Sequence, residues 1–131
     1  MPNALYDALF EQHRGSSRPF IFKPDGTSIT YADFLAMAAR MAHALRFCGV
    51  APGDRVAVQI AKSPEALALY IATVQAGAIF LPLNTAYTPS EIEYFVDNAG
   101  PKLLICDPSA VDALSPIAAA AGAALKTLAG D

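Results

Sequence analysis

The sequence predicts an α/β fold: a helix and a β-hairpin at the N-terminus, then a mostly parallel βαβ sheet with helices on both faces. Three observations support this prediction. Short apolar runs alternate with helical patterns from Arg55 onward, and the three clear runs start about two dozen residues apart, which is typical of strand–helix–strand units. Helix start signals precede the helical patterns, and Gly follows them. Right-handed crossovers then give a parallel sheet between layers of helices.

Before the sheet, the chain is expected to form a short amphipathic helix and a hairpin. These elements are assigned to Ala4–His13, Phe20–Lys23 and Ser28–Tyr31. The helix carries Leu5, Ala8 and Leu9 on one side, as an apolar face requires. Residues 24–27, Pro-Asp-Gly-Thr, supply the turn of the hairpin, because these residue types favour turn conformations.

A long helix follows the hairpin. Thr30 stands at its N-cap position, and Asp33 lies three residues later in the capping-box position. Apolar residues recur at steps of three and four, which places them on one helix face. These residues are Tyr31, Phe34, Leu35, Ala38, Met41, Ala42 and Leu45. Gly49 ends the helix, since Gly adopts the left-handed conformation that closes many helices.

Strands and helices then alternate along the rest of the chain. The strands are assigned to Arg55–Ile60, Ala78–Leu83, Lys102–Cys106 and Ala124–Leu128. Ser63 and Thr88 are the N-caps of the first two intervening helices, and each precedes a Pro at the first helical position. Glu91 completes a capping box with Thr88. The two helices stop at Gly77 and Gly100.

A further helix is expected over Ser109–Ala121, weakened by Pro116 because Pro lacks a backbone N–H. The chain ends at Gly130-Asp131, directly after the last candidate strand. A doubly wound domain usually covers its outer strand, and little is left here to do so. We therefore expect residues 1–131 to be a single α/β subdomain, a fragment of a much longer protein.

Composition and charge argue against several classes of protein. The chain is 54% hydrophobic and 16% charged, so it can build a core and does not resemble a disordered chain. The net charge is −3 and the nine basic residues are scattered, which argues against a nucleic-acid partner. No apolar stretch approaches the roughly 18 residues of a membrane span, and the N-terminus lacks the features of a signal peptide. We expect a cytoplasmic protein with no membrane partner.

Complete catalytic and metal-binding patterns are missing from the sequence. The nucleotide-binding patterns GxGxxG and GxxxxGK[ST] and the nucleophile elbow GxSxG do not occur. His13 and His43 have no second ligand at metal-site spacing. Cys48 and Cys106 form no Cys-x-x-Cys pair, and we expect them to be buried free thiols in a reducing compartment. We assign no catalytic, cofactor-binding or metal-binding residue.

Ligands of open α/β sheets bind outside the carboxyl ends of the strands. The polar residues expected at that edge are Lys62, Ser63, Asn84, Thr85, Tyr87, Asp107 and Ser109. Pro82 is expected to help end the second strand by removing an N–H donor. Simple structural roles also suit most of these residues. Those roles are a solvated charge for Lys62, helix caps for Ser63 and Thr88, local backbone bonds for Asn84 and Asp107, and packing for Tyr87 and Tyr94.

Several segments resemble the N-terminal part of adenylate-forming (AMP-binding) acyl-CoA synthetases. The matching motifs, in family order, are Ile29–Phe34, Gly53–Val56, Gln75–Ala78 and Pro82–Asn84. The stretch LPLNTAYT, followed by EIEYF and AGPKLLICDPS, is especially similar to malonyl-CoA synthetases. The resemblance extends from about Leu5 to Thr127. It implies the N-terminal subdomain of the adenylate-forming fold.

The resemblance also implies a reaction for the intact protein. A short carboxylic acid, malonate in particular, would attack the α-phosphate of Mg-ATP, and the thiol of coenzyme A would then displace AMP. This is the activity of an AMP-forming acid–thiol ligase. Mg-ATP and coenzyme A are implied for the intact enzyme only, because the family's phosphate loop and catalytic residues have no counterpart in these 131 residues.

The same resemblance sets expectations for the isolated chain. It should bind no cofactor and be inactive alone, and its main partner would be the remainder of the synthetase. Exposed apolar edges should make it self-associate. The alternative is a stand-alone, non-catalytic α/β module for binding or assembly, since fold does not dictate function.

Overall fold

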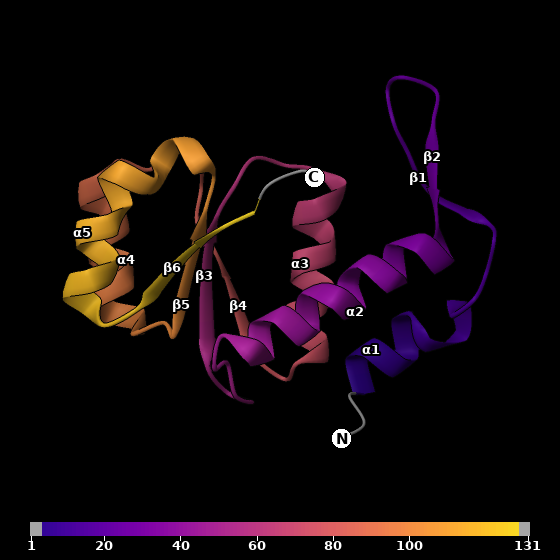
Figure 1. Ribbon diagram of the computed structural model, residues 1–131, viewed down its shortest axis with the longest axis horizontal. Helices are drawn as coiled ribbons and strands as arrows, with labels where there is room; N and C mark the ends of the chain where they lie inside the picture. The colour runs from indigo at the N-terminus through magenta and orange to yellow at the C-terminus, as the bar shows by residue number, and fades with distance from the viewer. Residues whose placement is uncertain (1–3, 129–131) are drawn as a thin grey trace.

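A four-stranded parallel sheet lies at the centre of the fold, and a hairpin stands apart from it (Figure 1). The computed structural model describes residues 4–128. The sheet strands are β3 (Arg55–Gln59), β4 (Ile79–Pro82), β5 (Leu103–Cys106) and β6 (Ala124–Thr127). Their order is β4-β3-β5-β6, and all three neighbouring pairs run parallel. The predicted fold class is confirmed, including the last strand.

The elements before the sheet follow the predicted order. They are α1 (Ala4–Leu9), the 3-10 turn η1 (Glu11–His13), β1 (Pro19–Phe22), β2 (Ser28–Thr30) and α2 (Tyr31–Phe47). β1 and β2 form an antiparallel hairpin in which Ile21 pairs with Ile29. At its turn the carboxylate of Asp25 accepts hydrogen bonds from the N–H of Thr27, at 2.9 Å, and from its hydroxyl, at 2.6 Å. These two bonds lower the pKa of Asp25.

The predicted apolar face of the first helix is wrong. Leu5 and Leu9 are 49% and 52% exposed, and Ala8 is also exposed. Tyr6 is buried instead, and Phe10 contacts aromatic rings of β1 and α2. Aromatic side chains bury more apolar area than Leu, so the helix turns Tyr6 toward the core, and Phe10, directly after the helix, lies on the same side.

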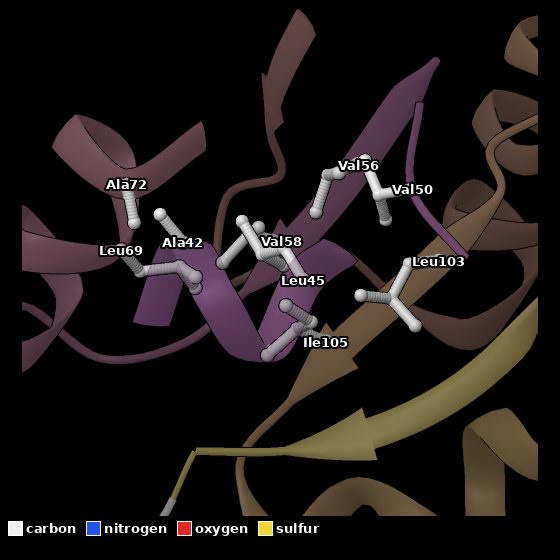
Figure 2. Close-up of a cluster of buried hydrophobic side chains, with 9 residues drawn as sticks. All are labelled: Ala42, Leu45, Val50, Val56, Val58, Leu69, Ala72, Leu103 and Ile105. Carbon is white, nitrogen blue, oxygen red and sulfur yellow. The ribbon is translucent and has the colours of Figure 1, made fainter. Parts of the chain in front are cut away.

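Helices cover both faces of the sheet, as predicted (Figure 1). Besides α2, they are α3 (Pro64–Gln75), α4 (Pro89–Ala99) and α5 (Val111–Ala121). Side chains of a strand alternate between its two faces. Val56 and Leu103 therefore pack against α2 and α3, in the cluster drawn in Figure 2. Ala57 and Leu104 point the other way and pack against α4 and α5.

The N-caps were predicted correctly. The hydroxyls of Thr30, Ser63 and Thr88 each accept a hydrogen bond from the N–H three residues later. The capping box at Thr88 is complete, because the carboxylate of Glu91 accepts from the Thr88 N–H at 3.2 Å. The last predicted helix divides into a 3-10 turn, η2 (Pro108–Ala110), and α5, which continues through Pro116. The chain end at residues 130–131 lies outside the described residues.

Pro82 lies on the open edge of the sheet and is the last residue of β4, but the predicted reason, removal of a ladder donor, was wrong. The N–H groups of Ile79 and Leu83 donate to the β3-side carbonyls of Asp54 and Val58, both at 2.8 Å. Backbone donors alternate in direction along a strand, so the nitrogen of Pro82 faces the open side, where its missing N–H removes no bond to β3. Pairing with β3 continues to Leu83, one residue past the proline.

Candidate functional site

The strand order places a topological switch point between β3 and β5. From β3 the chain moves outward to β4, and it then crosses back over β3 to β5. The connecting helices α3 and α4 therefore lie on opposite faces of the sheet. Open α/β sheets have a crevice at such a point, outside the carboxyl ends of the strands. This crevice is the first candidate location for a ligand.

A hydrogen bond of Asp107 spans the switch point. The Asp107 carboxylate accepts from the N–H of Ala61 at 3.2 Å, and the two residues lie 46 positions apart. The prediction that Asp107 bonds to local backbone was therefore wrong for its side chain, which joins the loop after β5 to the loop after β3. A hollow of about 200 Å³ remains there, lined by Ile60, Ala61, Ser63, Glu65, Asp107 and Leu128.

The loop after β4 is a tight turn centred on residues 84–87. The Asn84 side-chain oxygen accepts from the N–H of Ala86 at 2.9 Å, and the Tyr87 N–H donates to the Asn84 carbonyl at 3.0 Å. The predicted local role of Asn84 is confirmed. An Asn side chain that bonds the backbone two residues later forms a turn of its own. The chain therefore turns away from the strand direction at Asn84.

Gln59 is a residue of this edge that the sequence analysis missed. It is the last residue of β3 and only 9% exposed. Its side-chain Nε2 donates to the carbonyls of Asn84, at 3.0 Å, and of Tyr87, at 3.3 Å. An amide at the end of a buried strand was the available signal, because buried polar groups need hydrogen-bond partners. The sequence alone did not say which loop would supply them.

A second, larger hollow of about 550 Å³ opens between the loops after β3 and β4. Its apolar wall consists of Val58, Ile60, Ala66, Phe80, Pro82 and Leu83. Its polar residues are Lys62, Asn84, Thr85 and Tyr87. Lys62 is exposed, and no carboxylate within residues 4–128 forms an ion pair with it. This hollow has an apolar wall and one cation, a composition found in many small-molecule sites.

The residues predicted for this edge thus fall into two groups. Lys62, Asn84, Thr85 and Tyr87 line the larger hollow, and Ser63 and Asp107 line the smaller one. Ser109 lies in η2 and lines neither hollow.

The two tyrosines predicted to pack differ in their surroundings. The ring of Tyr87 stacks on Phe95 with centroids 5.1 Å apart, so its packing role is confirmed. The ring of Tyr94 also packs edge to face with that of Phe95, with centroids 5.6 Å apart, but Tyr94 is 65% exposed. The prediction of a packed Tyr94 was therefore wrong for most of its side chain, which faces outward from α4.

The two cysteines also differ from each other. Cys106 is fully buried, and this burial, together with the neighbouring Asp107 carboxylate, raises the pKa of its thiol. Cys48 is only half-buried, so the prediction of two buried thiols was wrong for one of them.

In the described part of the chain, no three His, Cys, Asp or Glu side chains group as a metal site would require. Every helix within residues 4–128 is too short or too polar to cross a membrane.

The chemistry available at this edge is positioning and charge. The Ser63 hydroxyl is engaged as a helix cap, and the Asp107 carboxylate holds backbone. Neither histidine lines a hollow of this edge. The ring of His13 stacks on the ring of Tyr31, with centroids 4.2 Å apart. A ligand at this edge would meet fixed backbone and an apolar wall, with Lys62 in the larger hollow and the carboxylates of Glu65 and Asp107 in the smaller one.

Comparison with known proteins places this fold in a family. A family model described as AMP-binding enzyme matches residues 10–129, which is most of the chain. The chain belongs to the AMP-binding enzyme family. MatB from Rhodopseudomonas palustris superimposes with a TM-score of 0.92 at 46% identity, over 98% of this chain and 26% of MatB.

Sequence relatives of this AMP-binding chain agree. Feruloyl-CoA synthase from Amycolatopsis sp is 39% identical over 81% of this chain and 21% of its own length. Surfactin synthase subunit 2 from Bacillus subtilis (strain 168) is 38% identical over 77% of this chain and 3% of its own length. The chain therefore spans about a quarter or less of MatB and of these two relatives. The predicted resemblance to adenylate-forming acyl-CoA synthetases is confirmed.

Proposed function

We propose that this chain is part of an acyl-CoA ligase that activates malonate. In that reaction a carboxylate oxygen bonds to the α-phosphorus of ATP and pyrophosphate leaves. The sulfur of coenzyme A then bonds to the acyl carbon and AMP leaves. The product would be malonyl-CoA, and the remainder of a longer synthetase would be the main partner of this chain. The cytoplasm remains the expected compartment.

The observation that carries this proposal is the 46% identity to MatB over 98% of the chain, since MatB is a malonyl-CoA synthetase. The feruloyl-CoA synthase match is lower, at 39% over 81% of the chain. The stretch from Leu81 to Thr88, which forms one wall of the larger hollow, also resembles malonyl-CoA synthetases. Both features favour a small dicarboxylic acid over an aromatic acid.

The residues of this chain do not by themselves fit Mg-ATP. A triphosphate site needs successive backbone N–H groups from a Gly-rich loop, and Mg²⁺ needs carboxylate oxygens beside the phosphates. Lys62 lines the larger hollow, whereas the carboxylates of Glu65 and Asp107 line the smaller one. Asp107 is already bonded to Ala61. In this proposal the phosphate chemistry belongs to the rest of the enzyme, and Asn84 and Tyr87 brace one of its walls.

Two assays test the proposal. The protein encoded by the whole reading frame is incubated with Mg-ATP, coenzyme A and either malonate, ferulate, benzoate or acetate, and AMP and acyl-CoA are quantified. We expect malonate to give the highest kcat/KM, and we expect the 131-residue chain alone to give no AMP. Preference for another acid would overturn the malonate assignment. A reading frame that ends at codon 131 would overturn the ligase proposal and favour the alternative of a stand-alone, non-catalytic module.

A further inference from the structure

We infer that Gln59 and Asp107 are positioning residues that hold the three loops at the carboxyl edge of the sheet in one fixed arrangement. Each residue stands at the end of a central strand or directly after it. Each also reaches across to the backbone of a loop that follows a different strand. This inference concerns the geometry of the loops, so it holds whichever acid the intact enzyme uses.

Gln59 holds the loop after β4 at both of its ends. A side-chain amide has two N–H donors, and here they meet two carbonyls, those of Asn84 and Tyr87. These are the first and last residues of the turn that closes through the Tyr87 N–H. Because Gln59 is itself buried in the middle of the sheet, its amide cannot follow the loop if the loop moves. The turn is therefore tied to the sheet as a unit.

Asp107 holds the loop after β3 in the same manner. Its own position is set by β5 on one side and by η2 on the other, where the Ala110 N–H donates to the Asp107 carbonyl at 2.9 Å. Its carboxylate then accepts from the N–H of Ala61. Ala61 directly precedes Lys62, and the segment 60–63 separates the two hollows. This single bond therefore constrains the wall between the hollows.

The two residues act on position more than on the stability of the core. Neither belongs to the hydrophobic clusters on the two faces of the sheet. All three bonds end on backbone atoms of loops. Breaking them should release the loops, while the sheet keeps its buried apolar contacts. A residue of the core would instead weaken every part of the domain.

Amide hydrogen exchange on the protein encoded by the whole reading frame, resolved to single amides, separates these two cases. Gln59→Met keeps the length of the side chain and removes both donors. We expect the Tyr87 N–H to exchange about tenfold faster, since each lost bond is a several-fold effect, while the amides of α2 change little. The control is Gln75→Met, because the Gln75 Oε1 has no hydrogen-bond partner within the described structure.

A second pair of variants tests Asp107 independently, and it also serves if Gln59→Met does not fold. Asp107→Ala should speed exchange at the Ala61 N–H about fivefold. Asp107→Asn should restore slow exchange, because its side-chain oxygen can still accept. If amide exchange became equally faster in the loops and in α2, both residues would only contribute to overall stability, and the inference would be wrong. Unchanged exchange at Ala61 in Asp107→Ala, or no rescue by Asp107→Asn, would also overturn the inference.

Discussion

The ring of Tyr70 on α3 meets the ring of Phe80 on β4 edge to face, with centroids 5.0 Å apart. This pair borders the open edge of the sheet, where no other strand of residues 4–128 pairs with the far side of β4. β4 reads Ile-Phe-Leu-Pro and contains no charged residue. Ile79 is 50% exposed there. Exposed strand edges usually carry charged residues or Pro that prevent association with another chain. In β4, Pro82 is the single residue of this kind.

The isolated chain is therefore expected to self-associate, in part through β4. Ile79→Lys adds a charge to this edge and should lower the apparent mass in sedimentation velocity. Leu9→Lys on α1 is the matched control, since Leu9 is 52% exposed and lies on a different element. A wild-type chain that stays monomeric across the accessible concentrations would contradict this prediction.

Asn84→Ala should have a modest effect on stability. The change removes the bond from the Ala86 N–H to the Asn84 side chain, but the Asn84 carbonyl remains for Gln59. We expect the free energy of unfolding in urea to fall by about 0.5–1 kcal/mol. Asn84→Asp keeps the acceptor and serves as the control. In the intact enzyme, a complete loss of adenylation with normal folding would show that Asn84 touches substrate.

Thr88→Ala removes an N-cap and half of the capping box of α4. Both the Glu91 N–H and the Glu91 carboxylate lose their partner at the Thr88 side chain. The loss of such a cap typically lowers the free energy of unfolding by about 1 kcal/mol. Thr85→Ala, at an exposed position of the preceding loop, should stay within about 0.5 kcal/mol of wild type. Equal effects of the two changes would refute this assignment.

The two thiols should react at different rates. Cys48 is half-buried, whereas Cys106 is buried and has a raised thiol pKa. Because the thiolate is the reactive form, alkylation by iodoacetamide under native conditions should modify Cys48 first. Mass spectrometry of digested samples locates the label, and Cys48→Ser provides the control. Rapid native labelling at Cys106 would contradict the burial seen here.

The raised pKa of Cys106 also predicts a pH dependence. The folded state favours the neutral thiol, so the thiol's contribution is fully present below the ordinary thiol pKa of about 8.5 and is lost as pH rises beyond it. The stability advantage of wild type over Cys106→Ala should therefore shrink at alkaline pH. Urea unfolding of both proteins at a series of pH values measures the difference in their free energies of unfolding. A difference that grows with pH would contradict a raised pKa at Cys106.

Local features were predictable from the sequence because neighbouring residues decide them. The hydroxyls of Thr30, Ser63 and Thr88 cap helices by reaching only three residues ahead. The turn at Asn84 likewise depends on two successive peptide units. Strand and helix periodicity then determined the α/β class, since burying one face of each element leaves few arrangements.

The assembly of the candidate site required the tertiary structure. The order β4-β3-β5-β6 brings Asp107 to Ala61 and Gln59 to the loop after β4, and no local pattern specifies such partners. The buried face of α1 also depends on distant residues. The side with Tyr6 faces the core because Phe10, directly after the helix, contacts aromatic rings of β1 and α2. The sequence by itself determined the elements, their caps and the family. Only the tertiary structure decided which distant backbone groups the buried amide and the carboxylate would satisfy, because that choice depends on which strands become neighbours.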